Sequence, residues 1–76
     1  MNQLLVSISV LRGRVYRFRK VECGASVTLI DAGETYKVFI PARLCIPIQI
    51  GIILTLVVYA TEQNFEAIRL IGEVVL

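Results

Sequence analysis

The sequence predicts a small all-β protein whose strands close into a barrel. Three observations favour this fold class. Apolar and polar residues alternate in several short stretches, as they do in half-buried strands. β-branched residues, which pack well on pleated sheets, crowd the longest apolar stretch, and turn-forming sequences with glycine separate the stretches. With 76 residues, the chain is expected to form a single domain over 1–76.

The N-terminal part is expected to supply one strand that is interrupted near Gly13. In its first part, the apolar residues Leu4, Val6, Ile8 and Val10 occupy alternate positions. Gly13 lies where this alternation is lost, and a glycine in such a place predicts a bulge or a sharp bend. The strand resumes over residues 15–20, and the Glu22-Cys23-Gly24 sequence after it is typical of a turn.

A hairpin is predicted next. Residues 26–30 read SVTLI and residues 35–40 read TYKVFI, and both are typical of strands. Between them, residues 31–34 read DAGE, in which the glycine can take the positive φ of a tight turn. Pro41, which cannot donate a ladder hydrogen bond, is expected to end the second strand. Residues 42–47 then form an irregular connector with room for one short helical turn.

The stretch over residues 47–62 has two interpretations. No residue between Arg43 and Glu62 is charged, and the run is near the minimum length of a membrane-spanning helix. Its many isoleucine, valine and threonine residues are instead typical of a buried strand. We favour one long strand, because Pro47 and Gly51 shorten the part that is able to form a helix.

A polar corner is expected at residues 62–64, followed by a last strand over 65–76. The first part of this segment also fits one face of a helix, but its β-branched end favours a strand. The strands together fit a five-stranded Greek-key OB-fold barrel, an architecture that leaves few sheet edges exposed. An SH3-like barrel is the alternative.

Several pieces of the chain occur in the order and at the approximate spacing found in the N-terminal OB-fold domain of RuvA, the bacterial Holliday-junction-binding family. They are Leu11-Arg12-Gly13, residues 27–31 with Gly33, residues 36–43, Gly51 and Leu70-Ile71-Gly72. The chain therefore resembles that domain over about residues 9–73. The resemblance implies an OB-fold, contacts within a homo-oligomer and a role with DNA in recombination and repair.

Two features of the family have no counterpart in this sequence. The residues after Gly72 do not contain the helix-hairpin-helix region with which the family grips DNA. The family's acidic pin falls near residues 62–66, where this chain reads EQNFE without adjacent paired acids. The resemblance thus implies the fold more strongly than it implies junction processing.

The residue content argues against catalysis. The chain has no histidine, which is the commonest general base and metal ligand, and it lacks a glycine-rich phosphate loop. Asp31 and Glu34 flank a turn and are expected to be solvated. Cys23 and Cys45 are expected to be free and buried, with a single disulfide as the alternative. We therefore expect a non-enzyme without metal, cofactor or small-molecule substrate.

The most informative stretch is residues 12–20, RGRVYRFRK, in which aromatic residues are interleaved with basic ones. The candidate nucleic-acid-binding residues are Arg12, Arg14, Tyr16, Arg17, Phe18, Arg19 and Lys20, with Lys37 on the next hairpin. On a regular strand the even-numbered residues share one face and Arg17 and Arg19 take the other, and a bulge shifts this parity.

Guanidinium groups contact phosphates and aromatic rings stack on bases, and OB-folds bind single-stranded nucleic acid through this combination. The cluster therefore predicts DNA, single-stranded or branched, as a partner. Tyr36 and Phe39 beside Lys37 are further stacking candidates. The alternative interpretation is a solvated basic face, with the aromatic rings packed in the core or across strands.

The chain is apolar for its size, with 57% hydrophobic residues and a mean hydropathy of +0.76. Apolar residues that exceed the needs of one small core usually contact a partner. We therefore expect a homo-oligomer, formed through residues 46–59 and 74–76. An oligomerisation or protein-interaction module without nucleic-acid binding is the alternative function. The N-terminus lacks the basic region of a signal peptide, so we expect a cytoplasmic protein without a membrane partner.

Overall fold

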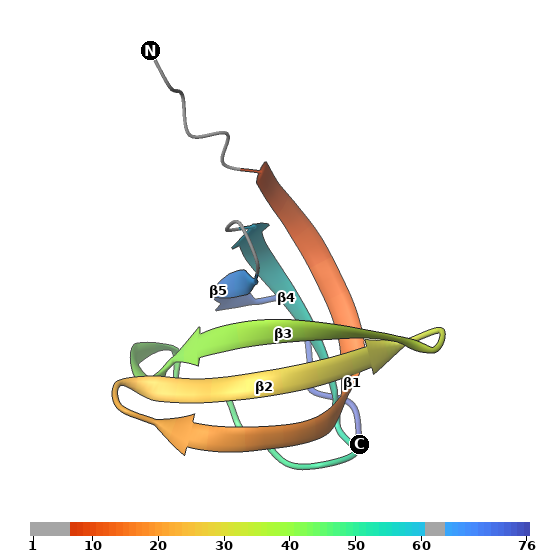
Figure 1. The fold of residues 1–76 in the computed structure, drawn as a ribbon, viewed down its shortest axis with the longest axis horizontal. Helices are drawn as coiled ribbons and strands as arrows, with labels where there is room; N and C mark the ends of the chain where they lie inside the picture. The colour runs from red at the N-terminus through yellow and green to blue at the C-terminus, as the bar shows by residue number, and fades with distance from the viewer. Residues whose placement is uncertain (1–6, 61–63) are drawn as a thin grey trace.

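The computed structural model describes residues 7–60 and 64–76 and shows an all-β fold, as predicted (Figure 1). Its elements are β1 (Ser7–Val21), β2 (Gly24–Asp31), β3 (Glu34–Pro41), a short 3₁₀-helix η1 (Ala42–Leu44), β4 (Ile53–Ala60) and β5 (Phe65–Leu70). The expected hairpin, its turn and the helical turn in the connector are confirmed. The expected strand residues Leu4 and Val6, and the corner residues Glu62 and Gln63, lie outside the described residues.

The sheet closes on itself as a barrel in the order β1-β2-β3-β5-β4, with β4 returning to β1. All neighbouring strands are antiparallel except β3 and β5, which pair in parallel through Val38 with Phe65 and Phe39 with Glu66. This closure is possible because β1 is long enough to pair with β4 through its first half and with β2 through its second half. The single strand expected over residues 4–20 is thus confirmed in the described part of the chain, where β1 runs without a break from Ser7 to Val21.

The bulge predicted at Gly13 is in the wrong place. The register of β1 against β2 shifts between Val15 and Arg17, so the extra residue is Tyr16. Gly13 has a different role, because β1 and β2 approach each other closely at this point. A Cβ on Gly13 would lie 2.9 Å from Cβ of Leu29, which is too close for any other residue type without movement of the strands.

The core is formed by one face of each strand. In β2 and β4 every second residue is buried, which is the period that a pleated strand requires. The buried residues are Val15, Ala25, Val27, Leu29, Val38, Ile40, Ile52, Leu54, Leu56, Val58 and Ala67. Much of the apolar 46–59 run that was expected to make self-contacts is thus already covered inside the barrel.

The stretch expected to be one long strand over residues 47–62 is a strand only from Ile53. Before it, the chain crosses below the barrel and joins β1 through hydrogen bonds from Val15 N to Ile52 O (2.8 Å) and from Gly51 N to Val15 O (2.9 Å). Gly51 has a φ of +96°, which explains why the strand does not begin earlier. In the part of the chain that the structure describes, no helix is long and apolar enough to span a membrane.

The last expected strand, over residues 65–76, ends early. β5 stops at Leu70, and Gly72 then turns the chain with a φ of +68°. Val75 returns to β4, where its N–H and C=O bond with the backbone of Ile53 at 3.1 and 2.6 Å. The segment is therefore a strand followed by a separate bridge, and the helical alternative is wrong.

The turn between β2 and β3 is strained at one residue. Ala32 and Gly33 form a two-residue loop between the paired residues Asp31 and Glu34, with φ values of +51° and +83°. Positive φ at both central residues is the condition for a type I′ turn, for which Asn-Gly is the preferred sequence. Gly33 meets this condition without strain, but the Cβ of Ala32 opposes it.

Replacing Ala32 with asparagine is therefore expected to stabilise the protein. An asparagine tolerates positive φ better than alanine does, and we expect the free energy of unfolding to rise by about 0.5–1 kcal/mol. Urea denaturation measures the change. The matched control is Ala42→Asn, also at an exposed alanine but without positive φ, where no gain is expected; equal gains at both positions would contradict the turn assignment.

Candidate nucleic-acid interface

The bulge at Tyr16 decides which basic residues of β1 face solvent together. After the shift, Arg17 lies opposite Thr28 and Arg19 lies opposite Ser26. The residues between them, Phe18 and its partner Val27, face the core. Arg17 and Arg19 thus lie on the outer face of the sheet formed by β1, β2 and β3. Without the bulge they would have been on the other face of β1 from the remaining candidate residues.

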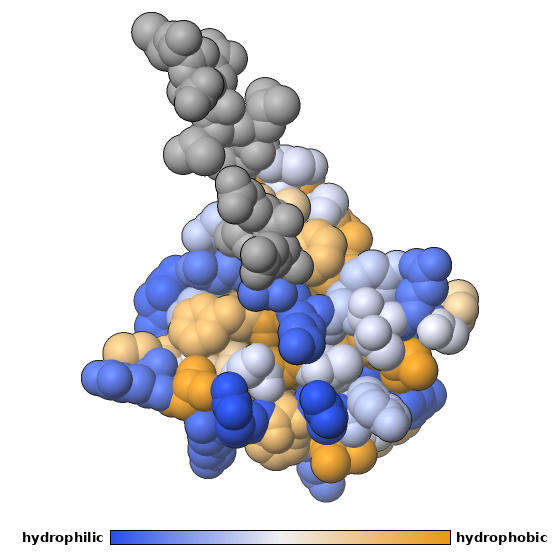
Figure 2. All heavy atoms as spheres, viewed as in Figure 1, coloured by the Kyte–Doolittle hydropathy of each residue, from blue (hydrophilic) through white to orange (hydrophobic). Residues whose placement is uncertain are grey.

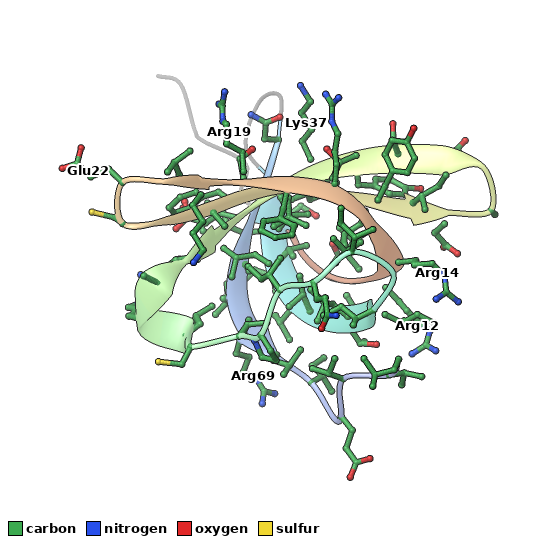
Figure 3. The ribbon with its side chains drawn as sticks, turned by 90° about the horizontal axis from the view of Figure 1, so that it is seen from below. Arg12, Arg14, Arg19, Glu22, Lys37 and Arg69 are labelled. Atoms are coloured by element: carbon green, nitrogen blue, oxygen red, sulfur yellow. The ribbon has the colours of Figure 1, made fainter. Side chains whose placement is uncertain are left out.

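A shallow hollow of about 540 Å³ occupies this outer face. We name it the basic hollow; its lining residues are Arg17, Phe18, Arg19, Ser26, Thr28 and Lys37. Lys37 joins from β3 because it pairs with Thr28, which in turn pairs with Arg17. In Figure 3 the side chains of Arg19 and Lys37 point away from the barrel on the same side of the sheet. Figure 2 looks onto this face, where hydrophilic residues lie over all three strands.

The positive charges of the basic hollow are available to a ligand. Arg17, Arg19 and Lys37 are exposed, and none of them takes part in the side-chain hydrogen bonds found among the described residues. Like charges on neighbouring strands repel one another, and an anion placed between them removes this repulsion. Ser26 and Thr28 add hydroxyl groups between the charged side chains, and hydroxyls donate hydrogen bonds to phosphate oxygens.

The aromatic residues near the hollow differ in their environment. Tyr16, at the bulge, is 59% exposed. Phe18 packs against the core and does not stand free on the surface. Phe39 pairs with Ser26 and therefore lies on the outer face, where its ring covers Gly24: a Cβ on Gly24 would lie 2.8 Å from Cζ of Phe39.

Arg12 and Arg14 do not belong to the basic hollow. They line a smaller depression together with Asp31. Arg14 Nη1 donates a hydrogen bond to the backbone oxygen of Gly51, and Arg12 Nη1 donates one to Oγ1 of Thr55 at 3.0 Å. In Figure 3 both arginines point away from Arg19 and Lys37. The curvature of β1 thus divides the basic cluster that is continuous in the sequence.

Lys20 is separated from the others as well. It lines an apolar groove of about 330 Å³ at one end of the barrel, together with Ile40, Ile46 and Ile48. Cys23 and Cys45 line the same groove. Both cysteines are free, as expected, but they are exposed and not buried, because Cys23 lies in the turn between β1 and β2 and Cys45 lies at the end of η1, both outside the sheet.

Two tyrosines have a raised pKa, and neither lines the basic hollow. The hydroxyl of Tyr36 donates to Oε2 of Glu34 at 3.0 Å, and that of Tyr59 donates to Oε1 of Glu66 at 2.9 Å. In each case the hydrogen bond to the carboxylate is the main cause of the raised pKa, because losing the proton would leave two negative charges in contact. Tyr36 also makes an edge-to-face contact with Phe65, with ring centroids 6.0 Å apart.

The Tyr59 hydrogen bond predicts a pH dependence of stability. The pKa of Tyr59 is raised in the folded state above its ordinary 10.0. The hydrogen bond therefore contributes fully to the free energy of unfolding below pH 10, and this contribution is lost as the pH rises through the folded-state pKa. We expect the free energy of unfolding of the wild type to fall above about pH 10 more steeply than that of Tyr59→Phe. Urea denaturation of both proteins at a series of pH values from 8 to about 11 tests this. The same decline of the free energy of unfolding with pH in the two proteins would contradict it.

Sequence reasoning missed Ser26 and Thr28 as part of the site. Nothing in their local sequence marks them; they become relevant only because the register of β2 puts them between Arg17, Arg19 and Lys37. No group of metal-binding side chains occurs among residues 7–60 and 64–76.

Fold and surface together define a small closed β-barrel with a basic outer face. Comparisons with protein-family models, with curated proteins and with solved structures found no match to this chain.

Proposed function

We propose that this protein is a non-catalytic OB-fold module that binds single-stranded nucleic acid, with DNA as the expected ligand, and that it works as a homo-oligomer in the cytoplasm without a cofactor. The observation that carries the proposal is the basic hollow on the outer face of β1, β2 and β3. Three unpaired cationic side chains from two strands converge there, with hydroxyls between them.

The strand order supports the OB-fold part of the proposal. An OB-fold is a five-stranded Greek-key barrel that binds oligonucleotides on the face of its second and third strands. This barrel has five strands, a long first strand shared by two neighbours and a connection from β3 to β4 that crosses one end. The basic hollow lies on β1, β2 and β3, so its position agrees with the face that OB-folds use.

We infer that the phosphate backbone contacts Arg17, Arg19 and Lys37, while bases stack on exposed aromatic rings. Tyr16 and Phe39 are the candidates for stacking, because Tyr16 is 59% exposed and directly precedes Arg17, and the half-buried Phe39 lies on the outer face opposite Ser26. Phe18, which packs against the core, is less suited to stacking than the sequence suggested. The binding is expected to tolerate many sequences, because phosphates and ring faces are common to all nucleotides.

Fluorescence anisotropy with a labelled single-stranded oligonucleotide tests the proposal. Three phosphate contacts predict a slope of about −2 in a plot of log affinity against log salt, since each contact contributes about −0.7 on a single strand. Affinity is therefore expected to fall about fifteenfold between about 50 and 200 mM salt. No binding at micromolar protein and low salt would exclude this function.

The same titration with a four-way DNA junction tests the resemblance to RuvA. If this chain shares only the barrel with that family, it is expected to bind a junction no more tightly than the single strands from which the junction is assembled. A preference of more than about tenfold for the junction would instead support a role in junction processing.

A protein-interaction module without nucleic-acid binding is the second candidate function. It is favoured by large apolar side chains that remain exposed, among them Ile8 at 67%, Val10 at 62% and Ile50 at 63%. Oligomer formation together with no anisotropy change at low salt would support this candidate.

A further inference from the structure

The N-terminal half of β1 has an open edge. Residues from Ser7 to Gly13 pair with β4 on one side, whereas pairing with β2 on the other side starts only at Arg14. Figure 1 shows this part of β1 extending past the β2–β3 hairpin beside β4, and within residues 7–60 and 64–76 no strand pairs with its other edge. Along the open side, every second residue presents its backbone N–H and C=O groups outward, and such an edge is a template for another strand.

The open edge lacks the devices that usually prevent strand pairing. Charged side chains, prolines and bulges protect most exposed edges. The stretch Ser7-Ile8-Ser9-Val10-Leu11 has none of these, since the basic residues of β1 begin at Arg12 and its bulge is at Tyr16. The two large side chains that it presents to solvent are both apolar.

We propose that this edge pairs antiparallel with the same edge of a second copy of the chain, around a twofold axis at Ser9. This inference deepens the homo-oligomer part of the proposed function. In this register Ile8 of each copy lies opposite Val10 of the other, and Ser9 lies opposite Ser9 of the second copy. The two β1–β4 sheets then form one continuous sheet across the axis.

The side-chain pattern favours a second copy as the occupant, and the placement of the charges permits it. The central residues Ile8-Ser9-Val10 match themselves when read in reverse, because a β-branched apolar residue lies on each side of Ser9, whereas the outer pair brings Ser7 opposite Leu11. The chain carries a net charge of +2, so two copies repel each other where their arginines meet. Pairing centred on Ser9 uses the uncharged part of β1 and leaves Arg12 of each copy outside the paired residues.

The apolar face next to the edge would also gain a partner. Ile8 and Val10 lie beside Tyr59 and Val57 of β4 on the outer side of the barrel. Dimerisation places two such rows next to each other, and cross-strand pairs of β-branched and aromatic residues stabilise sheets. Because only a short strand is paired, the contact is small, and we expect a dissociation constant in the micromolar range.

Two measurements test the interface. In sedimentation velocity, the wild type is expected to shift from monomer to dimer as its concentration rises from about 1 to 500 µM, whereas Val10→Lys stays monomeric because a charge on the edge blocks pairing. Ile50→Lys, which changes another exposed side chain outside the strands, is the matched control and is expected to dimerise like the wild type. A wild type that remains monomeric, or an equal loss in both variants, overturns the proposal.

The register is tested by cross-linking. In a background with Cys23→Ser and Cys45→Ser, the variant Ser9→Cys is expected to form a disulfide-linked dimer on mild oxidation, because directly opposed residues bring their Cα atoms within about 5.5 Å. Ser26→Cys, in β2 and away from the open edge, is expected to remain monomeric, and equal cross-linking of both variants counts against the interface. The anisotropy assay is independent: Val10→Lys leaves the basic hollow unchanged, so failure of DNA binding and failure of dimerisation are distinguishable.

Discussion

Replacing Arg17 and Arg19 together with alanine is expected to lower affinity for single-stranded DNA about thirtyfold at low salt. Each exposed contact between a cation and a phosphate is worth about 1 kcal/mol, so the loss of two contacts is worth about 2 kcal/mol. The salt slope is expected to fall from about −2 to about −0.7, because one phosphate contact, at Lys37, remains. Anisotropy titrations at several salt concentrations measure both quantities.

The matched control is the double variant Arg43→Ala and Arg69→Ala. It removes the same charge from two exposed arginines outside the basic hollow, one in η1 and one in β5. If binding depends on the hollow, the control is expected to keep its affinity within about twofold. Equal losses in the two double variants would show that affinity follows net charge alone, and the hollow would then not be the site.

Replacing Gly24 with alanine is expected to destabilise the protein severely. A Cβ at this position would overlap with the backbone oxygen of Ile40 and would lie 2.8 Å from the ring of Phe39. The ring can move, but the oxygen belongs to the β2–β3 ladder and cannot. We expect the free energy of unfolding to fall by about 3 kcal/mol, a large part of the roughly 4–11 kcal/mol typical of a chain this size.

Gly33 provides the comparison for this prediction. No atom lies within 4 Å of a Cβ built there, but its φ is +83°, so alanine is opposed only by backbone conformation, at about 1 kcal/mol. Urea denaturation of both variants separates the two causes. A loss at Gly24 no larger than that at Gly33 would contradict the close packing of β2 against β3 at this point.

The sequence was sufficient to predict the elements whose signals are local. The β2–β3 hairpin follows from alternating residues around Asp31-Ala32-Gly33-Glu34, and the structure confirms it. The all-β class follows from the β-branched content of the apolar run, which forms β4 instead of a helix. The hairpin and the all-β class depend on residues that are close together in the sequence, so a single sequence is sufficient to predict them.

The remaining features depend on distant residues. The bulge falls at Tyr16 and not at Gly13 because β1 changes partners from β4 to β2 nearby, and the register of β2 is not visible in the sequence of β1. That single residue moves Arg17 and Arg19 to the outer face, while the curvature of β1 separates them from Arg12 and Arg14, which line another depression. The basic cluster could therefore be found from the sequence, but its division into separate surfaces could not.

The most direct test of the central claim is to map the binding surface by NMR. During titration with a single-stranded oligonucleotide, the backbone amide signals of residues lining the basic hollow are expected to shift most, together with those of Tyr16 and Phe39. Signals of Cys23, Ile46 and Ile48 at the apolar groove are expected to stay in place. If the largest shifts instead cluster at that groove, or around Arg12 and Arg14, nucleic acid binds another surface and the basic hollow is not the interface.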